Sequence, residues 1–345
     1  MFDSSDEAYL KLDAAKGSGR RALVAGLGAS GRASLEYLLR RGWRASACDS
    51  RDKVPGLDGF LSAHPGISVS LGGIPESLPE GVDLVVMSPG ISPWFGPAAA
   101  LCLAARKAGV PVAGEIELFA EELAHLRETS GYAPKVIGIT GTNGKTTTTS
   151  LTAKIGEAAG LRTIAAGNIG PNAVTELLKA EDAGELPDLW VLELSSFQLD
   201  TTHTLRCDAA ALLNITEDHI NWHGSMEAYA AAKARIFSPD TVRVGNREDQ
   251  LALEWTKKGL KNPSLLRTFG EARPARRIRA RDGGSRLSGT LALLDGRNGS
   301  GDSLSARVGT SDQRPPQRNE CARGARSHGR RRRESAGGDR NAQNL

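Results

Sequence analysis

The sequence has few cysteines, few aromatic residues and no long apolar run. Its 345 residues include four cysteines, which are scattered without the spacing of a metal site. This usage argues against a disulfide-stabilised secreted domain and indicates a reducing cytoplasm. No apolar run approaches the roughly 20 residues of a membrane-spanning helix, and the acidic N-terminus lacks a signal-peptide core. We therefore expect a cytoplasmic protein that makes no membrane contact.

The charge of the chain divides it into two unlike parts. Residues 1–261 carry 26 Lys and Arg against 32 Asp and Glu, a net charge of −6. Residues 262–345 carry 18 Arg, no Lys and 8 acids, a net charge of +10, and the last aromatic residue is Phe269. The C-terminal part is rich in Gly, Arg and Ser and cannot bury much core. We predict a largely disordered tail over residues 268–345.

The N-terminal part predicts a Rossmann-like start. Strands are expected at Ala22–Gly26 and Arg44–Cys48, with a helix at Ala33–Arg41 between them. The intervening turn, GLGASG, matches G-x-G-x-x-G, and Asp49 follows about 20 positions on. This pattern indicates nucleotide binding but does not fix the nucleotide, so a dinucleotide-dependent dehydrogenase stays open.

A second ligand loop is expected after the next strand of this unit. Leu84–Met87 predicts a buried strand, and Ser88-Pro89-Gly90 follows it. Open α/β sheets bind ligands at the carboxyl ends of their strands. A simple turn is the alternative. A helix near Pro97–Ala108 and a short strand near Val110–Ala113 complete the unit, and an amphipathic helix follows after Glu115.

The stretch from Lys135 to Ala159 predicts a phosphate-binding loop between a strand and a helix. Val136–Ile139 is a β-branched run typical of a buried parallel strand. The chain breaks at Thr140–Gly144 and continues as a helix with Leu151 and Ile155 on one face.

The chemistry of this loop suits a nucleoside triphosphate. Gly141 and Gly144 let the backbone curl so that N–H groups face phosphate oxygens. Lys145 adds a cation, and Thr146 offers a hydroxyl to magnesium. The loop departs from the strict Walker pattern, because Ile139 stands where that pattern has glycine. A plain glycine-rich turn is the alternative.

Alternating strands and helices continue and predict a doubly wound, mostly parallel sheet. A helix from Met226 to Phe237 is expected, with Ser225 as its N-cap. Polar residues gather just past the strand ends, where such sheets keep their ligands. The expected strands are Thr163–Ala166, Leu189–Leu194, Ala209–Leu213 and Thr241–Gly245.

Three side chains of this second unit are candidates for chemistry, each with a plain alternative. Glu193 ends a hydrophobic strand, and a buried carboxylate there needs a partner. With Thr146 and phosphates it could hold magnesium; otherwise it is a solvated strand end. His219 would more often be structural, and Lys233, taken alone on a helix, would be a solvated surface residue.

Five ordered motifs together resemble the Mur ligases of peptidoglycan synthesis: GITGTNGKTTT, GNIG, ELSSFQL, NITEDHINWHG and YAAAKARIF. The resemblance covers about Arg20 to Gln250. Within that family the chain is most similar to the ligases that add D-glutamate to UDP-N-acetylmuramoyl-L-alanine. The resemblance implies a Rossmann-like UDP-substrate domain at 1–115 and a central P-loop ATPase domain at 116–267. It places the tail, 268–345, where the family has its amino-acid-binding domain.

The resemblance also implies roles for individual residues. The phosphate loop that would bind ATP is Gly141, Thr142, Asn143, Gly144, Lys145, Thr146 and Thr147. The residues that would hold the uridine nucleotide are Gly28, Ala29, Ser30, Gly31, Asp49, Arg51, Ser88, Pro89 and Gly90. The catalytic residues would be Lys145, Asn168, His219 and Lys233, and the magnesium ligands would be Thr146, Glu193, His219 and Lys233 once it is carbamylated.

The implied reaction is ATP-dependent amide ligation. The carboxylate of UDP-N-acetylmuramoyl-L-alanine would attack the γ-phosphate of ATP to give an acyl phosphate, which the amine of D-glutamate would then attack. Magnesium and Lys145 would neutralise charge as the phosphoryl group transfers. We expect ATP and Mg²⁺ as cofactors, a monomer, and no nucleic-acid partner.

The tail leaves three interpretations open. It could bind nucleic acid through its arginines, although no aromatic residues interleave for base stacking. It could be a native disordered extension. We favour an out-of-frame translation of a ligase gene, because the composition changes abruptly where the family's own sequence should continue; ligation would then be impaired. A folylpolyglutamate-synthase-like ligase, which shares the ATPase core, is a further alternative for the body of the chain.

Overall fold

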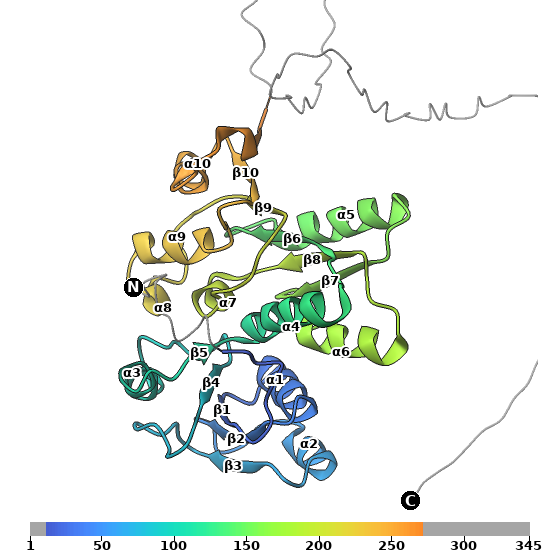
Figure 1. The fold of residues 1–345 in the computed structure, drawn as a ribbon. Coiled ribbons are helices and arrows are strands. Elements are labelled where there is room, and N and C mark those ends of the chain that lie inside the picture. Colours follow the sequence, from blue (N-terminus) through green and yellow to red (C-terminus); the bar gives the residue numbers. More distant parts are fainter. Residues whose placement is uncertain (1–11, 272–345) are drawn as a thin grey trace, which may run out of the picture. The chain divides into compact units, whose positions relative to one another are not determined.

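The computed structural model describes residues 12–271, which fold into α/β structure (Figure 1). Two parallel sheets follow one another along this range: the first ends at Ala113, and the second begins at Lys135. Within the described range no helix combines the length and the apolar character that crossing a bilayer requires. The predicted fold class is confirmed for this range, and the predicted tail at 268–345 lies outside it from residue 272 onward.

The first sheet has five strands in the order β3-β2-β1-β4-β5. Strand β1 pairs in parallel with both β2 and β4, so the glycine turn that follows β1 lies at the carboxyl edge of the sheet. The strands are β1 (Arg21–Ala25), β2 (Arg44–Asp49), β3 (Ser68–Leu71), β4 (Leu84–Met87) and β5 (Val112–Ala113), and the helices are α1 (Ala29–Arg40), α2 (Leu57–Ala63) and α3 (Ala99–Lys107).

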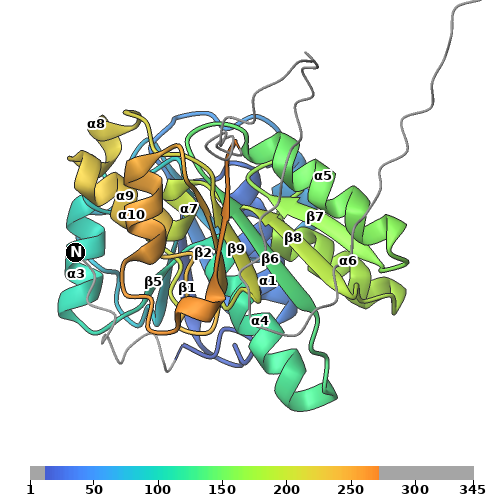
Figure 2. The same ribbon diagram turned by 90° about the horizontal axis from the view of Figure 1, so that it is seen from above.

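The second sheet has six parallel strands in the order β11-β10-β9-β6-β8-β7. Figure 2 shows this succession from the orange edge through β9, β6 and β8 to β7. The strands are β6 (Lys135–Thr140), β7 (Thr163–Gly167), β8 (Leu189–Glu193), β9 (Ala209–Leu212), β10 (Val242–Asn246) and β11 (Leu266–Phe269).

Helices cover both faces of the second sheet. In Figure 1, α5 lies above strands β6 and β8, and α4 and α6 lie below them. Ser225 accepts a hydrogen bond from the Ala228 N–H, which confirms the predicted N-cap of α9. The helices are α4 (Glu115–Ser130), α5 (Lys145–Ala158), α6 (Ala173–Ala183), α7 (Ser196–Asp200), α8 (Ile220–His223), α9 (Met226–Ala234) and α10 (Gln250–Lys257), with a 3₁₀ turn at Pro263–Leu265.

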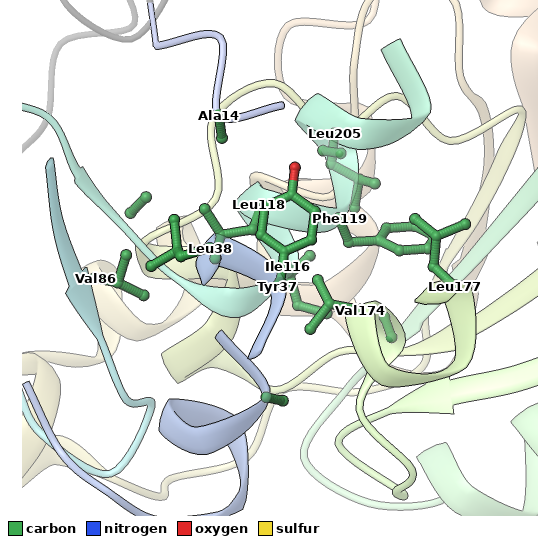
Figure 3. Packing of buried hydrophobic residues seen from close by; sticks show 14 of the residues in the cluster. Ala14, Tyr37, Leu38, Val86, Ile116, Leu118, Phe119, Val174, Leu177 and Leu205 are labelled. Atoms are coloured by element: carbon green, nitrogen blue, oxygen red, sulfur yellow. The ribbon is translucent and has the colours of Figure 1, made fainter. Parts of the chain in front are cut away.

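A large apolar core joins α1, α4 and α6. Tyr37 of α1, Phe119 of α4 and Leu177 of α6 are fully buried in one cluster (Figure 3). The Tyr37 hydroxyl donates to Glu122 Oε2 over 2.7 Å, so its polar end is satisfied within the core. Helix α1 therefore connects the first sheet to the helices beneath the second.

Three sequence expectations differ from the structure. The face of α5 with Leu151 and Ile155 does not pack on the sheet, because both side chains are more than half exposed. Strand β3 was not expected. The second sheet also gains an unexpected edge strand, β11, which pairs with β10 and carries the fold to Phe269, beyond the predicted limit at residue 267.

Candidate functional site

The predicted phosphate loop connects β6 to α5 at the carboxyl edge of the second sheet. Gly144 is the N-cap of α5 and has a φ of +83°, a left-handed conformation that favours glycine. The Lys145 Nζ donates to the carbonyls of Gly141 (3.0 Å) and Thr142 (2.9 Å). The ammonium group thus lies over the loop, beside the positive end of an α-helix, where phosphate is favoured.

A neighbouring loop holds the phosphate loop in shape. Asn214, which follows β9, accepts from the Asn143 N–H (2.8 Å) and donates back to the Asn143 carbonyl (3.0 Å). Thr142 Oγ1 lies 3.0 Å from the Tyr229 hydroxyl. Asn214 and Tyr229 are not among the site residues predicted from the sequence. Asn214 could have been predicted as a site residue because it lies just past the end of a strand. Tyr229 could not, because nothing in the helical pattern distinguishes it.

Glu193 lies beside this loop at the end of β8 and is 1% exposed. Its Oε2 accepts from Thr146 Oγ1 (2.9 Å), and its Oε1 accepts from Asn168 Nδ2 (2.7 Å). Both donors are neutral, and within residues 12–271 no cationic side chain is hydrogen-bonded to this buried carboxylate, which faces the phosphate loop. An oxygen donor set of this kind suits Mg²⁺, which prefers hard oxygen ligands. The structure therefore brings together three of the predicted residues.

Lys233 is buried, with 2% of its surface exposed, and the expectation for an isolated helical lysine is wrong here. Its Nζ donates to the Gly141 carbonyl over 2.9 Å and lies 4.5 Å from the centroid of the Tyr229 ring. Burial, followed by the nearby charge of Lys145, lowers the pKa of Lys233 to about 7. The amine therefore lies beside the phosphate loop, with its charged form disfavoured.

His219 lies at the start of α8, with a φ of +54° and a half-exposed side chain. Its ring centroid is 4.6 Å from that of Phe197 and 6.1 Å from that of Tyr229. In the part of the chain described here, His219 forms no hydrogen bond with Glu193 or Lys233. No group of three His, Cys, Asp or Glu side chains in residues 12–271 is arranged to hold a metal ion.

The first sheet carries a separate cavity of about 450 Å³ at its carboxyl edge. Asp49, at its wall, is 2% exposed and accepts from the Leu27 N–H (2.7 Å) and from Arg51. The Arg51 guanidinium and these N–H donors hold the pKa of Asp49 well below its usual range. The predicted residues that line the cavity are Gly28, Ala29, Ser30, Asp49, Arg51, Ser88, Pro89 and Gly90.

Gly31 is the one predicted uridine-site residue that does not line this cavity. A Cβ atom built on it would lie 1.8 Å from the Gly26 carbonyl oxygen. Glycine is therefore required here for the close approach of α1 to the preceding turn, which shapes the cavity from behind.

Comparison with protein families gives two matches. Residues 20–114 match the Mur ligase MurD-like N-terminal domain, and residues 139–304 match the Mur ligase middle domain. The second match extends past Asn262, where the composition changes, and ends outside the described residues. Together the two matches cover the first sheet and the second sheet except for the first part of β6.

Curated relatives agree with these matches. The chain is 51% identical over 253 residues to a UDP-N-acetylmuramoylalanine--D-glutamate ligase of Ralstonia nicotianae, covering 73% of this chain and 50% of the relative. It is 51% identical over 256 residues to the ligase of the same name from Paraburkholderia phymatum, covering 74% and 50%. The chain thus spans about half the length of the curated relatives it matches.

Solved structures give a more distant likeness. The UDP-N-acetylmuramate:L-alanyl-gamma-D-glutamyl-meso-diaminopimelate ligase from Neisseria meningitides has a TM-score of 0.46 and 19% identity. The match covers 73% of this chain and 78% of that one.

Proposed function

We propose that this chain, which belongs to the Mur ligase family, binds UDP-N-acetylmuramoyl-L-alanine and ATP as part of an ATP-dependent ligase that adds D-glutamate. The observation that carries the proposal is the buried Glu193 carboxylate, held at the phosphate loop by Thr146 and Asn168. A buried carboxylate that accepts from neutral donors beside a helix N-terminus suits a magnesium ion and phosphates. The protein would act in the cytoplasm as a monomer.

ATP would lie along the loop Gly141–Thr147, with its phosphates over the N-terminus of α5. Lys145 would leave the loop carbonyls that it now contacts and pair with the terminal phosphates. Magnesium, held by Thr146 and Glu193, would supply charge neutralisation for phosphoryl transfer. Asn168 would orient the Glu193 carboxylate through the 2.7 Å hydrogen bond.

The UDP part of the acceptor would occupy the cavity of the first sheet. Asp49, Arg51 and the loop Ser88-Pro89-Gly90 are among the residues that line it. The ionised Asp49 already holds the Leu27 N–H, so the glycine turn is fixed before ligand arrives. A pre-formed turn lowers the ordering cost of binding.

Lys233 would be carbamylated, as the family resemblance implies. Its Nζ would attack CO₂ and release a proton, which converts a buried amine into an anion beside the phosphate loop. That anion, with His219, would complete a second magnesium site. The buried position of Nζ against the Gly141 carbonyl supports this role, because an oxygen ligand placed there would face the same phosphates.

The ligase assignment can be checked with the whole 345-residue chain. We would measure ATP binding with Mg²⁺, UDP-substrate binding, and phosphate release with UDP-N-acetylmuramoyl-L-alanine in the presence and absence of D-glutamate. Lys145→Ala should abolish ATP binding, whereas Lys154→Ala, an exposed lysine on the same helix, should not. ATP affinity that survives Lys145→Ala, or binding of NADH in place of the UDP substrate, would refute the assignment.

A further inference from the structure

We propose that Glu115 is a positioning residue for the metal site. Its carboxylate holds the N-terminus of α6, and thereby the loop that presents Asn168 to Glu193. The inference rests on the proposed function, because it takes the Asn168–Glu193 pair to serve magnesium and ATP. Glu115 is the first residue of α4, directly after the first sheet, and no motif of the sequence identifies it.

The Glu115 side chain reaches the start of α6 from a different helix. It is 3% exposed, and its Oε1 accepts from the Val174 N–H over 2.8 Å. Val174 is the second residue of α6, whose own N-cap, Asn172, makes no side-chain capping bond. The first N–H groups of a helix have no partner inside it and need an outside acceptor. Glu115 provides that acceptor.

The loop between β7 and α6 is therefore fixed at both ends. At its beginning, Asn168 donates its backbone N–H to the Glu193 carbonyl (2.8 Å) and its side-chain amide to the Glu193 carboxylate (2.7 Å). The Gly167 N–H donates to the Pro171 carbonyl (2.9 Å) and closes the loop on itself. A shift at the start of α6 would thus be transmitted to Asn168 over a few residues.

Apolar packing holds α6 independently of this bond. Val174 and Leu177 of α6 lie in the same buried cluster as Ile116 and Phe119 of α4 (Figure 3). Removing the carboxylate should therefore leave α6 folded on α4 while it loosens the first turn. Among the described residues Glu115 Oε2 has no hydrogen-bond partner, so glutamine can keep the Oε1 acceptor in place.

The experiment compares Glu115→Ala and Glu115→Gln with a matched control, Glu117→Ala, in the full chain. Glu117 lies on the same helix, is fully buried, and accepts from the backbone N–H groups of His203 and Thr204, away from Asn168. The measurement is ATP binding as a function of Mg²⁺ concentration, together with thermal stability and UDP-substrate affinity.

We expect Glu115→Ala to raise the Mg²⁺ concentration for half-maximal ATP binding by about tenfold, as loss of support behind a metal ligand does. Glu115→Gln should restore it, and UDP-substrate affinity should not change. Glu117→Ala should lose stability without altering the Mg²⁺ dependence. Equal Mg²⁺ shifts in the two alanine variants would show a merely structural role and overturn the inference. A parent protein that binds no ATP with Mg²⁺ would instead refute the proposed function.

A second measurement covers the case in which Glu115→Ala does not fold. Hydrogen exchange of residues 168–174 is followed in Glu115→Asp, which is one methylene shorter, and in Glu115→Gln. Faster exchange in the aspartate variant alone is the expected result. The same protection in both variants would contradict the capping role.

Discussion

Glu115 should also make the stability of the protein depend on pH, and replacing it with glutamine should remove that dependence. Burial raises the pKa of Glu115 from 4.5 to about 7, although the N–H groups of Val174 and Ala173 oppose the shift. Between these two values the unfolded chain binds fewer protons than the folded one. The free energy of unfolding that this group contributes is therefore fully present below pH 4.5 and is lost as the pH rises through 7.

The size of the effect follows from the same two values. A change from 4.5 to about 7 corresponds to about 3 kcal/mol, at roughly 1.4 kcal/mol per pKa unit. We expect Glu115→Gln to gain about this much stability relative to the parent between pH 5 and pH 8. Burial also raises the pKa of Glu121 to about 7. Glu121 titrates in both proteins, so its contribution cancels in the difference between their free energies of unfolding.

The assay is urea denaturation of the parent, Glu115→Gln and Glu128→Gln at half-unit steps from pH 5 to pH 8. Glu128 is an exposed residue on the same helix, and its variant should follow the parent at every pH. Parallel curves for the parent and Glu115→Gln would refute the reasoning, because they would show that the folded protein places no penalty on the ionised carboxylate.

Two further substitutions test how the domains are built. Gly31→Ala would place a Cβ atom 1.8 Å from the Gly26 carbonyl oxygen, so we expect a loss of about 2 kcal/mol of stability and weaker UDP-substrate binding by calorimetry. The control is Gly59→Ala, where a Cβ meets nothing within 4 Å; it should keep UDP-substrate binding and lose no stability, because alanine is favoured over glycine inside a helix. Tyr37→Phe removes the buried hydrogen bond to Glu122 and should cost about 1–3 kcal/mol in urea denaturation; an unchanged midpoint would mean that this bond adds nothing.

The sequence predicted the central strands well, because buried parallel strands read as apolar runs. Leu84–Met87 is fully buried and was predicted without error in its bounds. The two edge strands that were not predicted, β3 and β11, lack this signal. Ser68–Leu71 is mostly exposed, and Leu266–Phe269 is only partly buried. Their pairing depends on a neighbouring strand far along the chain, which local pattern does not reveal.

The candidate site was predictable to the extent that it follows strand ends. Glu193 and Asn168 each come directly after or at the end of a strand, and parallel strands bring such residues to one edge. The structure adds that they contact each other. No sequence feature identifies Tyr229 as a site residue, because a tyrosine on a helix usually belongs to the core. Its contact with Thr142 joins residues that are 87 positions apart in the sequence.

The burial of Lys233 is the clearest feature of the site that depends on tertiary structure and not on the local sequence pattern. Its surroundings in the sequence, AAKAR, give a small apolar helix face on which a lysine normally extends into water. The structure instead directs Nζ to the Gly141 carbonyl, 92 residues away, over the ring of Tyr229. Burying an ammonium costs free energy unless it is paired, and no carboxylate is bonded to it within residues 12–271. The fold thus places beside the phosphate loop a lysine whose charged form burial disfavours, a combination that is found more often at functional sites than elsewhere in proteins.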